Sequence, residues 1–342
     1  MKLALVSTAA VLVSFSAVAC TSSTEEPSAN ESAVHNGGAP ANACANLASG
    51  PFTPGDIGTL FNGSEDFTFD GNGGIVGHNG AAMNVVTPSS EAGAAPQTRT
   101  LGNIAGQTWG VRYQANGNLL VASPQQNKII SIAPDGTQSD FFAGLSGPNG
   151  IYVAHDGNVF LTEFGGRVSK IAPDTTRTVY AQGASVAQGA DGITVDEDKG
   201  IVFYDEYQKG KISRIAVNAS PGTAPVAVAT IPGAALDGML LDECGNILVL
   251  DNGRNRLFRV RTDVQGNAVG QSELLATFPK NVAAANFGAG PGFDPKTLYV
   301  TGNPGVVYTL QLGVGGKNVV HPAPPAVDPT TTPPTDPAGS TH

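Results

Sequence analysis

The chain has 342 residues, of which 44 are Gly and 24 are Pro, while only 13% are charged and 41% are hydrophobic. This composition indicates many turns around an extensive apolar interior, as is typical of β-rich proteins. The formal net charge is −10 and Lys and Arg form no cluster, which argues against a nucleic-acid-binding protein and against docking on an anionic membrane surface.

Residues 1–20 have the pattern of an export signal. Met1 and Lys2 precede the apolar stretch "LALVSTAAVLVSFSAVA", and Cys20 follows it. The sequence "SAVAC" also resembles a bacterial lipobox, in which the cysteine is lipidated, although Ala17 stands where Leu is usual. Cleavage after Ala19 without lipidation is the alternative. We therefore expect an exported protein, anchored in the cell envelope only through lipid on Cys20, or else periplasmic or secreted.

Residues 21–58 are predicted to be a flexible tether. Most of this region is polar, small and aperiodic, so it cannot bury enough surface to offset the entropy lost on ordering. If Cys20 carries lipid, Cys44 and Cys244 remain, and an oxidising compartment would allow a disulfide between them. Two buried thiols are the alternative, because sequence alone does not place the two Cα atoms within bonding range.

Residues 59–315 contain a repeated unit of about forty residues. Four copies read "TWGVRYQANGNLLVAS", "PNGIYVAHDGNVFLTEF", "ADGITVDEDKGIVFYDEY" and "LDGMLLDECGNILVLDN", and weaker copies begin at Glu65 and Asn286. Each copy has an alternating strand, a turn and a second strand, followed by a third strand such as "GRVSKIAPDT". Four strands per repeat predict an all-β, six-bladed β-propeller with four-stranded blades around a central channel. Residues 316–342, rich in Pro and Thr, are predicted to be a disordered tail.

Polar residues begin the innermost strands of five predicted blades. In a propeller these strands start at the same rim of the channel, so their first residues converge. The column contains Glu65, Trp109, Asn149, Asp191 and Asp237. Three carboxylates forced together would lose their charge or bind a cation. Oxygen ligands of this kind suit Ca²⁺ best and Mg²⁺ or Mn²⁺ next, whereas the lack of His and Cys disfavours zinc.

The alternative is that these residues only shape the backbone. Asn-Gly and Asp-Gly are common turn dipeptides, and the Asn and the two Asp residues of the column each precede a glycine. Turn chemistry does not account for Glu65 in the same column, so the sequence favours a metal site formed by Glu65, Asn149, Asp191 and Asp237.

The motifs "GSEDFTF", "GPNGI", "GADGITVD", "LDGMLLDECGNILVLD" and "FGAGPGFDPKTLYVT" resemble successive blade signatures of the gluconolactonase and senescence-marker-protein propellers. "GSED" also resembles the first-blade motif of the paraoxonases. The resemblance implies Ca²⁺-dependent hydrolysis of a small lactone or ester by a monomer, with the four polar column residues binding the ion. Asp191 stands where the family usually has Asn. Asp66 matches one ligand of a second calcium in paraoxonases but Gly150 does not match the other, so the resemblance does not extend to a second ion.

The resemblance also suggests which residues act on the substrate. Paraoxonases have a histidine at the column position of Trp109, so a histidine-assisted mechanism is not expected here. A carboxylate is then the candidate base, Asp237 first and Asp191 second, while Trp109 and Asn149 would contact the substrate. His78 is expected in an exposed loop. The competing hypotheses are a non-catalytic cell-surface propeller that binds a ligand or protein and keeps a structural metal, and a structural repeat with an empty channel.

Overall fold

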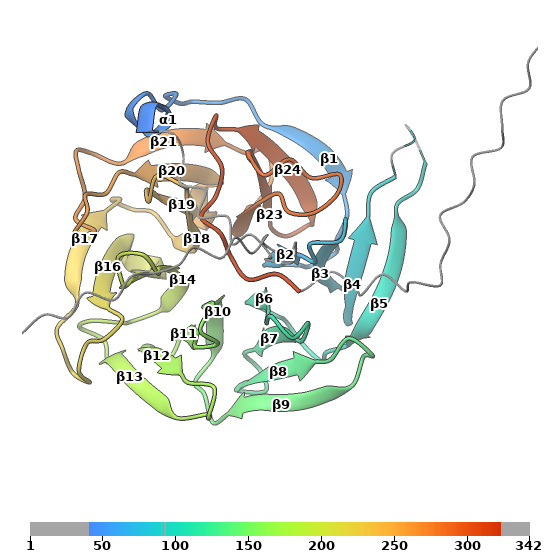
Figure 1. The fold of residues 1–342 in the computed structure, drawn as a ribbon, viewed down its shortest axis with the longest axis horizontal. Coiled ribbons are helices and arrows are strands. Elements are labelled where there is room, and N and C mark those ends of the chain that lie inside the picture. The colour runs from blue at the N-terminus through green and yellow to red at the C-terminus, as the bar shows by residue number, and fades with distance from the viewer. Residues whose placement is uncertain (1–40, 90, 92–93, 323–342) are drawn as a thin grey trace, which may run out of the picture. The chain divides into compact units, whose positions relative to one another are not determined.

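Twenty-four strands form six four-stranded antiparallel sheets around a common axis in the part of the chain that the structure describes (Figure 1). The structure is a computed structural model, and it describes residues 41–89, 91 and 94–322. The predicted six-bladed propeller is thereby confirmed. The predicted signal segment with Cys20 and most of the predicted tail lie outside the described residues.

Five blades are continuous in sequence, with the strand nearest the axis first. The first blade contains β2 (Phe67–Phe69), β3 (Ile75–Asn79), β4 (Ala82–Thr87) and β5 (Gln97–Asn103). The second contains β6 (Val111–Tyr113), β7 (Leu119–Ser123), β8 (Lys128–Ile132) and β9 (Gln138–Ala143). The third contains β10 (Pro148–Val153), β11 (Val159–Glu163), β12 (Arg167–Ile171) and β13 (Arg177–Gln182). The fourth contains β14 (Ala190–Asp196), β15 (Ile201–Glu206), β16 (Lys211–Ala216) and β17 (Val226–Thr230), with the 3₁₀ turn η1 (Tyr207–Lys209). The fifth contains β18 (Leu236–Leu241), β19 (Ile247–Asp251), β20 (Arg256–Val260) and β21 (Glu273–Thr277), with the 3₁₀ turn η2 (Asn252–Arg254).

The sixth blade is assembled from both ends of the described chain. Its inner strands are β22 (Ala284–Phe287), β23 (Thr297–Thr301) and β24 (Val306–Gln311), and β1 (Gly55–Thr59) pairs antiparallel with β24 as its outer strand. The predicted tether, residues 21–58, includes all of β1 except Thr59, so the propeller begins earlier than predicted. The strand "GDIGT" is short and mostly exposed, so its sequence carries no apolar pattern that would reveal its pairing partner.

The core lies between neighbouring blades. Second strands such as β7, β11 and β19 are buried at every residue, because a blade packs against neighbours on both faces. Between the fourth and fifth blades, for example, Phe203 and Ile212 pack with Met239 and Val249. This packing fixes where the inner strands start, and so it positions the residues at the channel mouth.

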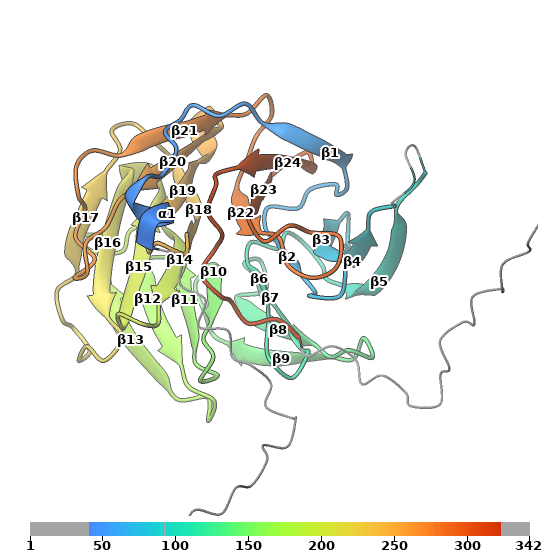
Figure 2. The same cartoon turned by 45° about the horizontal axis from the view of Figure 1, so that its top comes forward.

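A segment that follows β24, residues 312–322, crosses the axis at the C-terminal ends of the inner strands (Figures 1 and 2). The Gly315 amide donates to Glu243 at 2.9 Å, and the Lys317 ammonium lies 2.8 Å from Asp196 and 2.6 Å from Asp198. His321 reaches the first blade, where its Nδ1 lies 3.2 Å from the carbonyl oxygen of Phe69. Residues 316–322 were predicted to belong to a disordered tail, but the pairing of Lys317 with acidic groups of the fourth blade places them on the propeller.

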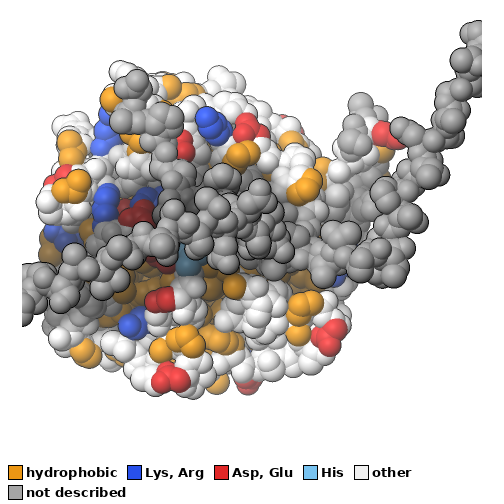
Figure 3. Space-filling model, in the orientation of Figure 1, with side chains coloured by type: hydrophobic (Ala, Val, Ile, Leu, Met, Phe, Trp, Pro, Cys, Tyr) orange, Lys and Arg blue, Asp and Glu red, His pale blue; other side chains and the backbone are white. Residues whose placement is uncertain are grey.

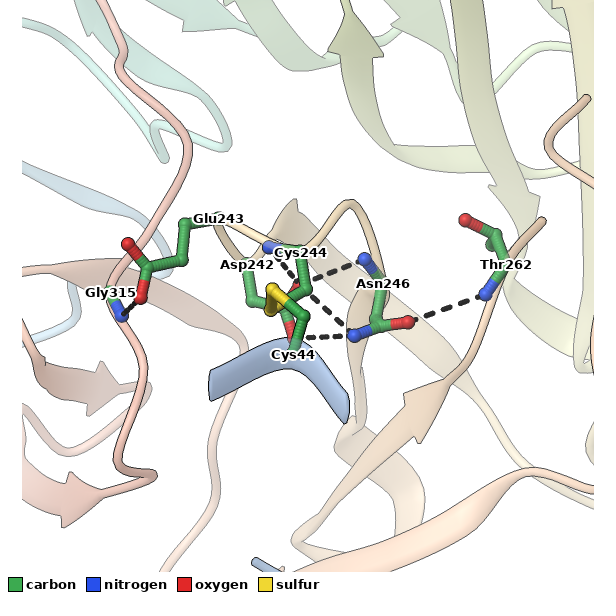
Figure 4. The surroundings of a disulfide bond; sticks show 7 residues. All are labelled: Cys44, Asp242, Glu243, Cys244, Asn246, Thr262 and Gly315. Atoms are coloured by element: carbon green, nitrogen blue, oxygen red, sulfur yellow. Dashed lines mark hydrogen bonds between the residues drawn. A yellow bond between two sulfur atoms is a disulfide. The ribbon is translucent and has the colours of Figure 1, made fainter. Parts of the chain in front are cut away.

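A disulfide joins Cys44 to Cys244, which are 200 positions apart in the sequence (Figure 4). Cys44 lies in helix α1 (Ala41–Ala45), and Cys244 lies in the turn after β18, where Asp242 accepts hydrogen bonds from the amides of Cys244 and Asn246. The disulfide therefore fastens the segment before β1 to the fifth blade.

The surface carries both signs of charge. On the face shown in Figure 3, acidic and basic side chains stand among one another rather than in separate areas. Among the described helices, none has the length and apolar character needed to cross a membrane.

Candidate metal centre

The polar column predicted from the repeats meets at one cavity. Glu65, Asn149, Asp191 and Asp237 line a cavity of about 20 Å³ at the N-terminal ends of the inner strands, and Trp109 lines it as well. A space of about 10–15 Å³ holds one water-sized particle, so this cavity is of the size for a single ion or water. Five separate blade repeats thus contribute to one small polar site.

Bulges in the inner strands turn these side chains toward the axis. The ladder shifts register between Pro148 and Ile151 in the third blade, and corresponding shifts occur at the starts of β14 and β18. The dipeptides Asn149-Gly150, Asp191-Gly192 and Asp237-Gly238 occupy the shifted positions. A bulge leaves residues out of the ladder and re-aims a side chain, and such bulges are frequent next to active sites. The dipeptides are therefore strand bulges and not turns, which corrects the turn-forming alternative.

The glycines after the ligands allow neighbouring blades to approach closely. A Cβ atom on Gly192 would lie 2.2 Å from the carbonyl oxygen of Asp237, and one on Gly150 would lie 2.5 Å from that of Asp191. Gly238 donates its own amide to the Ala283 carbonyl oxygen at 2.7 Å. The backbones of adjacent blades thus touch beside each ligand, and this contact brings the carboxylates together.

Burial and mutual repulsion disfavour charge on these carboxyl groups. Burial raises the pKa of Glu65 to about 8, and the adjacent Asp66 carboxylate adds to the increase. Burial also raises the pKa of Asp191 and that of Asp237 well above the usual range; the charges of Asp205 and Glu65 add to the first, and those of Asp191 and Glu65 to the second. Without a cation the cluster therefore holds protons near neutral pH, and a cation would displace them.

Asp205 is an acidic group of the site that the sequence analysis missed. It lies in β15, directly behind the bulge, and its Oδ1 accepts a hydrogen bond from the Gly192 amide at 3.3 Å. Its other oxygen, Oδ2, is buried and has no hydrogen-bond partner among the described residues. Thr162 has the corresponding place in the third blade, where its hydroxyl accepts from the Gly150 amide at 2.9 Å. Aligning second strands as well as first strands would have shown this substitution of a carboxylate for a hydroxyl.

The donor set fits a hard divalent cation. The described residues contain no group of three or more His, Cys, Asp or Glu side chains already arranged to ligate a metal. Instead, Asn149 and Asp237 line the same cavity as Asp191 and favour its charged form, so that oxygen atoms from three blades lie around one small space. Oxygen ligands alone, an ion-sized cavity and an unpartnered buried carboxylate oxygen nearby match the needs of Ca²⁺, and also of Mg²⁺ or Mn²⁺.

The guanidinium group of Arg112 pairs with Asp66. Arg112 Nη1 lies 2.7 Å from Asp66 Oδ2, and the amide of Val111 donates to the same oxygen at 2.9 Å. The guanidinium group therefore balances the charge of Asp66, the residue that matches one ligand of a second calcium.

The histidine expected in an exposed loop is buried. His78 lies in β3 with 4% of its surface exposed, its Nε2 lacks a partner among the described residues, and it does not line the cavity. Burial lowers its pKa. The expectation of an exposed His78 was wrong, because "IVGHN" forms β3, the second strand of the first blade, whose residues are mostly buried.

Solved structures with the same fold include several propellers of the kind expected from the motifs. A calcium-binding protein, regucalcin, from Agrobacterium tumefaciens has 16% identity and a TM-score of 0.60, covering 80% of this chain and 99% of that chain. A gluconolactonase from Xanthomonas campestris has 16% identity and a TM-score of 0.59, covering 74% and 88%. A luciferin-regenerating enzyme has 15% identity and a TM-score of 0.61, covering 79% and 99%. No family model and no curated protein matches the chain. At these identities the similarity establishes the fold.

Proposed function

We propose that the protein is a calcium-dependent hydrolase of lactones or esters. The observation that carries this proposal is the convergence of Glu65, Asn149, Asp191 and Asp237 on one ion-sized cavity at the channel mouth. The fold shared with a gluconolactonase and with a calcium-binding regucalcin supports the same activity and the same ion. Mg²⁺ and Mn²⁺ are the alternative ions, since they use the same oxygen ligands.

The residues around the cavity would have different roles in hydrolysis. A bound divalent cation would polarise the substrate carbonyl and lower the pKa of a nearby water. Asp237 would accept a proton from that water as its oxygen bonds to the carbonyl carbon, with Asp191 as the second candidate for this role. The ester C–O bond then breaks, and the proton returns to the departing alkoxide, giving a carboxylic acid and an alcohol. Burial and the neighbouring carboxylate raise the pKa of Asp237, which favours its holding this proton until the alkoxide departs.

Two side chains would orient the substrate. Asn149 lines the cavity and can donate from its amide nitrogen, and Trp109 closes one side of the cavity with an aromatic ring. Both are expected to affect the Michaelis constant more than the turnover number, because they contact substrate without taking its proton.

The test is a panel of lactones and aryl esters assayed with the metal-free and the calcium-loaded protein. We expect calcium-dependent turnover that falls at least about 100-fold in Asp237→Asn, the range for loss of a general base. Asp135→Asn, which changes an exposed turn residue far from the cavity, is the matched control and should retain activity. Calcium binding without turnover of any substrate would contradict the hydrolase and favour the ligand-binding propeller with a structural ion.

We also propose that the protein is exported and anchored by lipid on Cys20. The signal-like segment supports export, and the Cys44–Cys244 disulfide is of the kind that persists in an oxidising compartment. Metabolic labelling with palmitate should label the wild-type chain and not Cys20→Ser. Export of an unlabelled wild-type chain would instead show a soluble periplasmic or secreted protein.

A further inference from the structure

Three aromatic side chains form a continuous arc beside the candidate metal centre. Trp109 and Phe164 meet edge to face with ring centroids 5.9 Å apart. Phe164 and Tyr207 meet in the same way at 6.1 Å. The three residues come from the second, third and fourth blades, so the arc follows the rim of the channel over three consecutive blades.

One end of the arc lines the cavity, and the other end packs against strands that carry two of the candidate ligands. Trp109 lines the cavity itself, together with Glu65 and Asp191. Tyr207 is the first residue of the turn η1. This turn packs against β14 and β18, the strands that carry Asp191 and Asp237. The Tyr207 hydroxyl lies 3.0 Å from Asn252 Oδ1 and donates a hydrogen bond to it, so the ring is the part of this side chain left to meet a ligand.

Two glycines in the left-handed region of backbone conformation lie beside the arc. A Cβ atom on Gly147, where φ is 63°, would lie 3.6 Å from Phe164 Cβ and 3.8 Å from the Trp109 ring. One on Gly189, where φ is 61°, would lie 3.7 Å from the Phe164 ring and 4.0 Å from Tyr207 Cβ. Both glycines therefore lie beside the rings, close enough that an added methyl group would touch them, and the ring contacts make the arc one continuous wall.

The middle of this wall faces solvent. Phe164 is 37% exposed, although the residue before it in the sequence, Glu163, is fully buried. Exposing a large aromatic ring beside a polar cavity forgoes the free energy of burial, and such exposure marks ligand-binding surfaces when several apolar groups adjoin.

Several basic side chains at this end of the blades have few free hydrogen-bond donors for a polyhydroxylated ligand. Five basic side chains here are already paired with carboxylates that are fully buried. The pairs are Arg167 and Arg177 with Glu163, Lys209 and Lys211 with Glu206, and Arg256 with Asp251. A sugar lactone presents hydroxyl groups that need free donors and acceptors, whereas an alkyl or aryl group needs only apolar contact.

We propose that the aromatic arc of Trp109, Phe164 and Tyr207 binds the apolar substituent of the substrate, so that the site takes alkyl- or aryl-substituted lactones and esters in preference to sugar lactones. The proposal rests on the proposed hydrolase function, since it names the substrate class of that site. The metal centre would hold the carbonyl end of the substrate, and the arc would hold the other end.

The experiment uses the single tryptophan of the chain as a probe of the arc. Fluorescence of Trp109 is followed in the full mature protein with EDTA, so that binding is measured without metal-dependent turnover. The ligands are γ-butyrolactone, γ-hexalactone, γ-octalactone and glucono-δ-lactone. We expect the Kd to fall about fourfold with each added methylene, as for burial of that group, and gluconolactone to bind no better than butyrolactone.

Variants of Phe164 test the arc directly. Phe164→Ser should abolish most of the dependence on chain length, and Phe164→Leu should restore part of it. Because the ring is partly exposed, both variants are expected to fold, which circular dichroism checks. A Kd independent of chain length, tighter binding of gluconolactone, or chain-length dependence that persists in Phe164→Ser would each overturn the proposal.

The outcome separates the arc from the hydrolase. Chain-length-dependent binding with no turnover of any lactone or ester would support the arc and contradict the proposed function. Calcium-dependent turnover in which kcat/KM is highest for sugar lactones would support the function and contradict the arc.

Discussion

Replacing Glu65 with Gln should remove part of a pH-dependent loss of stability in the metal-free protein. In the folded protein the pKa of Glu65 is raised from 4.5 to about 8, mainly by burial. Between these two pH values the folded chain keeps a proton that the unfolded chain has lost, so the free energy of unfolding falls as the pH rises. Gln carries no charge at any pH and therefore escapes this loss.

The size of the effect follows from the shift. A difference of about 3.5 pH units corresponds to a ceiling of about 5 kcal/mol, at about 1.4 kcal/mol per unit. Glu65 is partly exposed, and water screens its charge, so we expect about half of that ceiling, or about 2–3 kcal/mol. For a domain of this size such a difference corresponds to a change of about 5 °C in Tm.

The assay is thermal unfolding followed by circular dichroism in EDTA from pH 5 to pH 8. Wild type and Glu65→Gln should be equally stable near pH 5, and the variant should be the more stable by about 5 °C at pH 8. Glu91→Gln, at an exposed position, is the matched control and should follow the wild type. In the wild type, added calcium should abolish the fall in stability between pH 5 and pH 8. In Glu65→Gln it should not. Parallel pH profiles for wild type and Glu65→Gln would refute the burial of a carboxyl cluster at this site.

Three further changes test the contacts that hold the channel and the ends of the chain. Arg112→Met should destabilise the fold by about 3 kcal/mol because it leaves the buried Asp66 unpaired, and adding Asp66→Asn should recover most of this loss in urea unfolding. Reducing the Cys44–Cys244 disulfide should lower the stability by up to about 5 kcal/mol, the chain-entropy value for a loop of 200 residues, and an unchanged midpoint in dithiothreitol would contradict this. Lys317→Met should cost about 1–3 kcal/mol by removing a cation from a fully buried aspartate, and faster proteolysis near the C-terminus should accompany it; equal protease resistance would argue against the crossing segment.

The repeats made the architecture predictable from the sequence. Strict alternation in the inner strands and glycines at matching positions gave the number of blades and the strand order, and the aligned column placed five residues at one cavity. These features are predictable because each blade solves the same packing problem, so its pattern recurs at a fixed spacing.

Features that depend on contacts between distant segments could not be predicted in this way. β1 has no apolar alternation, and only its pairing with β24 makes it part of the sixth blade. Arg112 occurs in a single blade, so no repeat marks its pairing with Asp66. Phe164 reads as one more apolar residue after a strand, and its role depends on rings contributed by the neighbouring blades.

The most direct test of the central claim is calorimetric titration of Ca²⁺ into the metal-free wild-type protein and into Glu65→Gln at pH 8. We predict one site per chain in the wild type, with proton release on binding because the cation displaces protons from the raised carboxyl groups. The variant should bind at least about tenfold more weakly, because it loses a charged ligand to a dipositive ion. Absence of calcium binding to the wild type, or equal affinity of both proteins, would contradict the claim that these carboxylates form a metal centre.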